Sequence, residues 1–113
     1  MAKYEKHLVG DFDAFLEYLF DGIMNGSVSA SYEDGSEWTA NGVRVAVRVF
    51  ERFSYMGGNR VSLNITLAGS GNNLFLTAIT AGGSQAMFWK VNTIGEENFL
   101  DKVIELAESY AGG

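Results

Sequence analysis

The chain has 113 residues, no cysteine and a formal net charge of −6. The absence of cysteine excludes disulfide bonds, thiolate catalysis and cysteine-ligated metals. The acidic balance argues against a nucleic-acid partner, whose phosphates it would repel.

A chain of 113 residues predicts a single domain over 1–113, since single cores typically span about 100 to 150 residues. No run approaches the ~18 apolar residues of a membrane span, and no apolar segment follows the charged start of the chain. We therefore expect a cytoplasmic protein with no membrane partner.

The first elements follow from spacing. Residues 3–9 alternate weakly and predict a strand. Apolar residues at three- and four-residue spacing predict a helix over 12–24, with Asp11 as its N-cap. Asn25 and Gly26 then predict the end of this helix.

A short strand is expected next at 27–33, with an optional short return strand at 36–40. Between them, Asp34-Gly35 is a pair typical of tight turns. Asn41-Gly42 has the same chemistry and predicts a second turn, which leads into a long strand over 43–55.

The long strand and the run after it predict a hairpin with one buried face. Apolar residues occupy odd positions in both 43–53 and 61–67. A loop of even length would place these two sets on opposite faces of the sheet. We therefore expect an odd loop or a bulge, either within 56–59 or at Glu51-Arg52.

The last elements are a strand over 74–81, a further strand over 85–92 after a turn at 81–84, and a helix over about 95–110 whose N-terminus carries a Thr93–Glu96 capping box. The predicted fold is α+β, in the order β-α-β-β-β-β-α. It is an antiparallel meander of five to six strands with an N-terminal and a C-terminal helix packed on one face.

Arg44, Arg48 and Arg52 recur in phase on the long strand. Ordinary alternation favours a solvated face whose arginines pair with acidic side chains. The alternative is a site for a small anionic ligand, since arginine forks suit carboxylates and phosphates. The candidate ligand-binding residues are Arg48, Arg52, Arg60, Asn64 and Lys90.

No catalytic residue, metal site or cofactor is predicted. His7 is the only histidine and has no recognisable acid or serine partner by spacing. The glycine-rich stretches lie between strands, whereas a phosphate loop leads into a helix. An enzyme that uses Glu51, Arg52, Tyr55 or Lys90 rests on residue type alone and ranks last.

Aromatic residues suggest an interface. Phe88 and Trp89 are adjacent on an expected strand, so they point to opposite faces, and two helices cover only one of these faces. Phe50 lies among the even-numbered arginines and also lacks an obvious cover. Phe50, Phe88 and Trp89 are therefore candidate residues of a homodimer interface.

Three stretches carry a resemblance to a known family. They are Val49–Ser54, Gly57–Arg60 and Gly82–Glu97, of which Glu-Arg-Phe-Ser and Gly-Gly-Asn-Arg are the more specific pieces. Over nearly its full length the chain resembles a family of short bacterial proteins of unknown function, mostly from Gram-positive bacteria. The resemblance implies a cytoplasmic single domain and transfers no site.

Together these observations favour a non-catalytic binding or interaction module that acts as a homodimer. The alternative is a carrier or sensor of a small anionic ligand that is held by the strand arginines.

Overall fold

The computed structural model describes residues 2–26, 30–53, 60–82 and 89–112. In chain order its elements are β1 Ala2–Val9, α1 Phe12–Gly26, β2 Ser31–Ala40, β3 Val43–Phe53, β4 Arg60–Ser70, β5 Asn73–Gly82 and α2 Trp89–Gly112. This order confirms the predicted β-α-β-β-β-β-α arrangement. The sheet has five strands, at the lower end of the predicted range.

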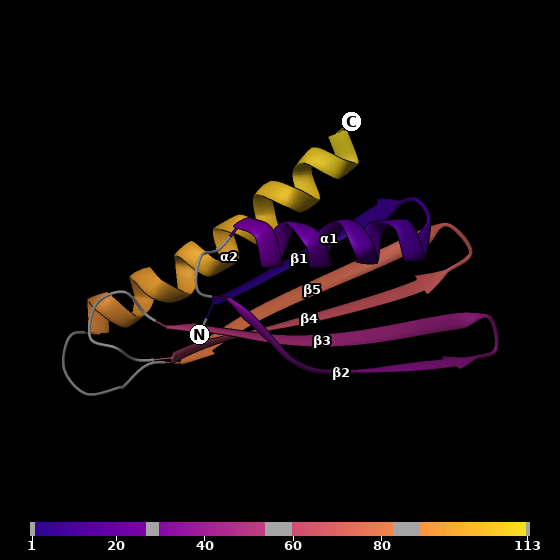
Figure 1. Ribbon diagram of the computed structural model, residues 1–113. Coiled ribbons are helices and arrows are strands. Elements are labelled where there is room, and N and C mark those ends of the chain that lie inside the picture. The colour runs from indigo at the N-terminus through magenta and orange to yellow at the C-terminus, as the bar shows by residue number, and fades with distance from the viewer. Residues whose placement is uncertain (1, 27–29, 54–59, 83–88, 113) are drawn as a thin grey trace.

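The strands form one antiparallel sheet in the order β1-β5-β4-β3-β2. Strands β2 to β5 are a meander, and β1 joins it at the far edge by pairing with β5. Both helices lie on the same face of this sheet, as Figure 1 shows. The core therefore lies between the helices and one side of the sheet.

Helix α1 forms as its spacing predicts. Asp11 caps it, because its Oδ2 accepts a hydrogen bond from the backbone N–H of Ala14 at 2.9 Å. The buried side chains of this helix are Phe12, Phe15, Leu19 and Ile23. The predicted N-cap and buried face are both confirmed.

The Asn41-Gly42 turn is also confirmed. Asn41 has φ 53° and Gly42 has φ 79°, the left-handed pair required by a type I′ turn. It joins β2 to β3 with Ala40 paired to Val43. Asparagine and glycine are the residues that adopt this conformation with least strain.

The predicted turn at Asp34-Gly35 is wrong. Both residues lie inside β2, which runs unbroken from Ser31 to Ala40 and has a bulge between Tyr32 and Asp34. A Cβ built on Gly35 would lie 2.5 Å from the hydroxyl oxygen of Tyr32 and 2.7 Å from the carbonyl oxygen of Val47. The glycine therefore permits a close approach in a bulged strand rather than a chain reversal.

The expected odd loop after β3 is also wrong. Phe53 pairs with Arg60, so six residues, 54–59, separate the two strands, and the pairing runs from Val43 to Phe53 without a shift at Glu51-Arg52. An expected bulge within 56–59 lies outside the described residues. Even positions of β3 thus pair with odd positions of β4, which places Ala46 and Phe50 under the helices.

The C-terminal region departs from prediction at its start. Helix α2 begins at Trp89, so residues 89–92 are helical rather than extended, and Thr93 lies inside the helix instead of capping it. Short apolar runs such as 85–92 do not distinguish a strand from a helix by periodicity. The later part agrees, with Phe99, Leu100, Val103 and Ala107 buried as predicted.

Candidate functional site

The sheet has a second face, opposite the helices, which we call the open face. Its centre consists of the residues of β3, β4 and β5 that alternate with the buried ones. These nine positions are Val45, Val47, Val49, Asn64, Thr66, Ala68, Phe75, Thr77 and Ile79.

The composition of the open face changes from centre to rim. None of the nine central positions is charged, and six of them are apolar. The rim on β1 carries Lys3, Glu5, His7 and, at its end, the exposed Val9, and the rim on β2 carries Asp34, Ser36 and Trp38. An uncharged centre inside a polar and aromatic rim is the usual anatomy of a protein interface.

Trp38 is the largest exposed apolar side chain of this surface. It is 64% exposed and pairs across the strands with Val45. On β1, at the opposite edge, the ring of His7 lies 4.7 Å from that of Phe75, measured between centroids. Aromatic side chains at the edge of an apolar patch are enriched at interfaces because they bury a large area.

The three in-phase arginines share a face, as predicted, but it is the face under the helices. Arg44 donates two hydrogen bonds of 2.9 Å to the carboxylate of Asp13 in α1, and its guanidinium lies 4.2 Å from the ring centroid of Phe12. The hydrogen bonds from Arg44 lower the pKa of Asp13. Arg44 therefore links β3 to α1.

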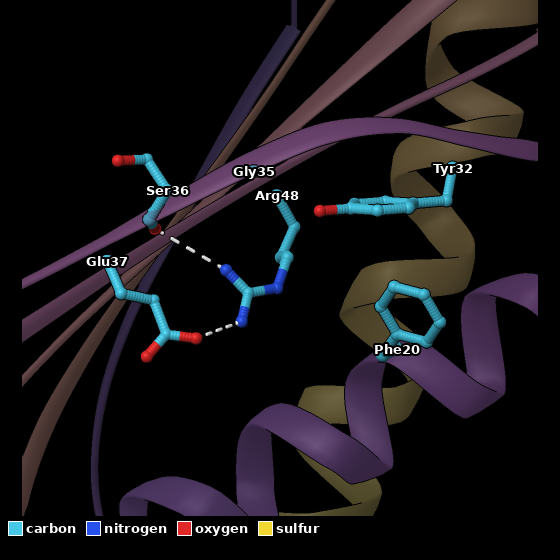
Figure 2. A pocket seen from close by; sticks show the side chains of 6 residues that line it. All are labelled: Phe20, Tyr32, Gly35, Ser36, Glu37 and Arg48. Atoms are coloured by element: carbon cyan, nitrogen blue, oxygen red, sulfur yellow. Dashed lines mark hydrogen bonds and ion pairs between the residues drawn. The ribbon is translucent and has the colours of Figure 1, made fainter.

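Arg48 borders a pocket beside α1 (Figure 2). It donates hydrogen bonds to the carbonyl oxygens of Val47 at 3.0 Å and Ser36 at 3.4 Å, and it forms an ion pair with Glu37. The pocket has a volume of about 370 Å³ and is lined by Phe20, Tyr32, Gly35, Ser36, Glu37 and Arg48. The guanidinium of Arg48 is already bound by groups of β2 and β3.

Arg52 lies at the α2 end of the same row. Its guanidinium is 5.3 Å from the ring centroid of Phe99, and its buried Nε has no hydrogen-bond partner within the described part of the chain. The arginines of β3 thus contact three neighbouring elements: Arg44 reaches α1 and Glu37 of β2, Arg48 reaches β2, and Arg52 reaches α2.

The other candidate ligand residues do not join this row. Asn64 lies on the open face, where its Oδ1 accepts a hydrogen bond from the hydroxyl of Thr66 at 2.9 Å. Arg60 lies at the start of β4 and donates to Glu51 at 2.7 Å. Lys90 is in the first turn of α2, and its side chain lies outside the described residues. Arg48 and Asn64 therefore occupy opposite sides of the sheet.

The candidate interface residues also need correction. Phe50 is 1% exposed and packs against Phe20 and Tyr32, so it belongs to the core rather than to a surface. Phe88 lies outside the described residues, and Trp89 is in α2 instead of a strand, with a side chain that is not described. Among the described residues, the centre of the sheet face opposite the helices is largely apolar, but other residues form it.

Sequence reasoning missed the valines of β3 and Trp38. The signal was present, because the run from Val43 to Phe50 has apolar residues at both odd and even positions. Such a strand has apolar side chains on both faces, and the arginines at even positions made the even face look polar in the sequence.

A polar cluster links β1 to α2. The hydroxyl of Tyr4 donates to Glu108 at 2.5 Å, and Lys6 donates to the same carboxylate at 3.3 Å. Burial, followed by the hydrogen bond and charge of Glu108, raises the pKa of Tyr4 to about 12. The residues of 2–26, 30–53, 60–82 and 89–112 contain no cluster of side chains with the spacing of a metal site.

Neither helix in the described ranges has the length and apolar character needed to cross a membrane. The model of a family described as a family of unknown function (DUF6054) matches residues 1–111. No curated protein matches the chain.

Proposed function

We propose that this chain, which belongs to the family of unknown function DUF6054, is a non-catalytic interaction module. It acts as a homodimer through its open face. The observation that carries the proposal is the uncharged centre of this face inside its polar and aromatic rim. A surface of this kind is more stable when a matching surface covers it.

The size of the open face agrees with this function. Five strands spaced about 4.8 Å apart make a face roughly 24 Å wide, and strands of ten residues are roughly 33 Å long. The product, on the order of 800 Å² of projected area, is comparable to the accessible area that one partner typically contributes to a specific interface. Two such sheets pack about 10 Å apart with interdigitating side chains.

The polar groups of the other face support a structural rather than a catalytic role for the arginines. Arg44 and Arg48 are each bound to a carboxylate on another element, Asp13 or Glu37. Groups paired in this way hold neighbouring elements together, and they are not free to bind a substrate without losing that contact.

The test is native mass spectrometry of the purified chain over a dilution series, with Val47→Glu as the variant. Val47 is in the middle of the open face, and two copies of a buried, unpaired carboxylate should abolish the dimer. We expect a dimer mass for the wild type and a monomer mass for Val47→Glu.

The matched control is Ala14→Glu, which adds the same charge at an exposed position of α1 on the helix side. This variant should remain dimeric. A wild type that is monomeric at every concentration, or a Val47→Glu variant that dimerises like the wild type, would contradict the proposal.

The same spectra test the alternative, a carrier of a small anionic ligand. The pocket beside Arg48 is the observation that favours it, although an anion there must displace Glu37. A reproducible extra mass that disappears in Arg48→Gln, but persists in Arg44→Gln, would place the carrier function ahead.

A further inference from the structure

The register of the sheet aligns residues of all five strands into rows across the open face. The row nearest the start of β1 begins with Lys3 and ends with Asp34 on β2. The next row begins with Glu5 and ends with Ser36, and its centre lies at Thr66. Residues that end one row occupy opposite edges of the sheet.

A third row runs from His7 to Trp38. Between them lie Phe75, Ala68 and Val45, in the order β5, β4, β3. A small side chain thus occupies the middle of this row, with larger apolar side chains on both sides. The three rows form a surface whose two rims differ in charge and in aromatic content.

Two copies of a face can pack together by a two-fold axis in the plane of contact, and in aligned packing this axis runs either across the strands or along them. An axis across the strands through the middle row places each strand over its own copy. Glu5 then lies against Glu5, and Lys3 lies against His7. Like charges in contact disfavour this arrangement.

An axis along the strands gives a different match. It places β1 over β2 of the other copy and keeps every row in step. Lys3 then lies against Asp34, and Glu5 lies against the neutral Ser36. The angle of about 30° between aligned sheets shifts their corners, and the four-carbon stem of lysine spans that shift.

The apolar contacts also fit this axis. Phe75 lies over Val45 of the other copy, and the small Ala68 lies at the axis, where a side chain meets its own copy. At the rim, His7 lies against Trp38. Large side chains therefore meet smaller ones across the contact.

We propose that the homodimer has its two-fold axis along β4, with Lys3 of each copy paired to Asp34 of the other. This proposal rests on the homodimer proposed above and adds its geometry. It predicts two equivalent charge contacts per dimer, both between position 3 and position 34.

The experiment uses Lys3→Asp and Asp34→Lys, alone and mixed in equal amounts. Alone, each variant brings like charges together twice, and its dimer dissociation constant should rise about tenfold. In the mixture both contacts again join opposite charges. Native mass spectrometry should then show the heterodimer well above the 1:2:1 statistical proportion of a random mixture.

Two further variants keep the test decisive. Asp34 accepts a hydrogen bond from the backbone N–H of Gly35, so Asp34→Lys risks a folding defect. Asp34→Asn retains a side-chain oxygen that can accept this hydrogen bond. In the double variant Lys3→Asp/Asp34→Asn it should relieve part of the repulsion between positions 3 and 34. Glu5→Lys mixed with wild type should stay statistical, whereas an axis across the strands would enrich that heterodimer.

The outcomes separate the two proposals. A wild-type dimer that Val47→Glu disrupts, together with a statistical mixture of Lys3→Asp and Asp34→Lys, would overturn the axis along β4 and leave the homodimer standing. A monomeric wild type would overturn both.

Discussion

At the scale of single residues, the arginines of β3 show how charged groups are accommodated under helices. The guanidinium of each arginine reaches a carboxylate, a carbonyl or an aromatic ring. Arg44 contacts α1 and β2, Arg48 contacts β2, and Arg52 contacts α2. The same spacing that first suggested a ligand strip serves the attachment of three elements to one strand.

The contact between Tyr4 and Glu108 predicts a pH dependence at both extremes. The pKa of Tyr4 is raised from 10.0 to about 12. The contribution of Tyr4 to the free energy of unfolding is therefore complete below pH 10 and is lost as the pH rises through that interval. The hydrogen bond from Tyr4, followed by that from Lys6, lowers the pKa of Glu108 from 4.5. The contribution of Glu108 is therefore present above pH 4.5 and is lost as the pH falls.

The variant Tyr4→Phe removes the hydroxyl and tests both limbs. The free energy of unfolding of wild type and variant should differ most between about pH 5 and 9, and the difference should shrink outside that range. Urea unfolding at a series of pH values measures it. A difference that is the same at every pH would show that the hydroxyl contributes nothing through these two pKa shifts.

At the scale of elements, local chemistry predicted some features well and others not at all. Helix α1 and the Asn41-Gly42 turn depend on residues close in sequence, and both formed as expected. Which face of β3 is buried depends on the side of the sheet that the helices cover. The residues within the strand do not determine that side. Ala46 and Phe50 became the buried pair because the six-residue connection to β4 set the pairing.

The prediction of a turn at Asp34-Gly35 was wrong for a related reason. The same glycine chemistry suits a tight turn and a bulge, and only the partner strand decides between them. Because Gly35 lies against backbone of β3, its lack of a side chain is a packing requirement.

Gly35→Ala should therefore destabilise the fold by about 1–3 kcal/mol, since the carbonyl oxygen of Val47 cannot move away as a flexible side chain can. Thr39→Ala, at an exposed position of the same strand that does not face the open face, should stay within about 0.5 kcal/mol of wild type. Chemical denaturation measures both. Equal stability of Gly35→Ala and wild type would show that the bulge does not need a glycine.

At the scale of the whole molecule, the sequence indicated a two-layer protein with an uncovered surface but assigned that surface to the wrong residues. Phe50 lies in the core, whereas Val45, Val47 and Trp38 lie on the open face. The ligand residues were dispersed for the same reason, because Asn64 and Arg48 fall on opposite sides once the register is known.

A homodimer links stability to concentration. Because unfolding separates the copies, the Tm of the wild type should rise by about 3 °C for each tenfold increase in protein concentration. The Tm of Val47→Glu should not change with concentration. Differential scanning calorimetry at three concentrations measures both, and a concentration-independent wild-type Tm would argue against a dimer that is coupled to folding.

The bulge in β2 affects whether strands of other molecules can add to the edge of the sheet. Strand β2 forms one margin of the sheet, and an unpaired margin can template a foreign strand and extend without limit. The bulge interrupts its ladder, and Glu33, Asp34 and Glu37 place acids along it. An edge strand of this kind disfavours the addition of further strands, which is compatible with the proposed contact between two copies through the open face.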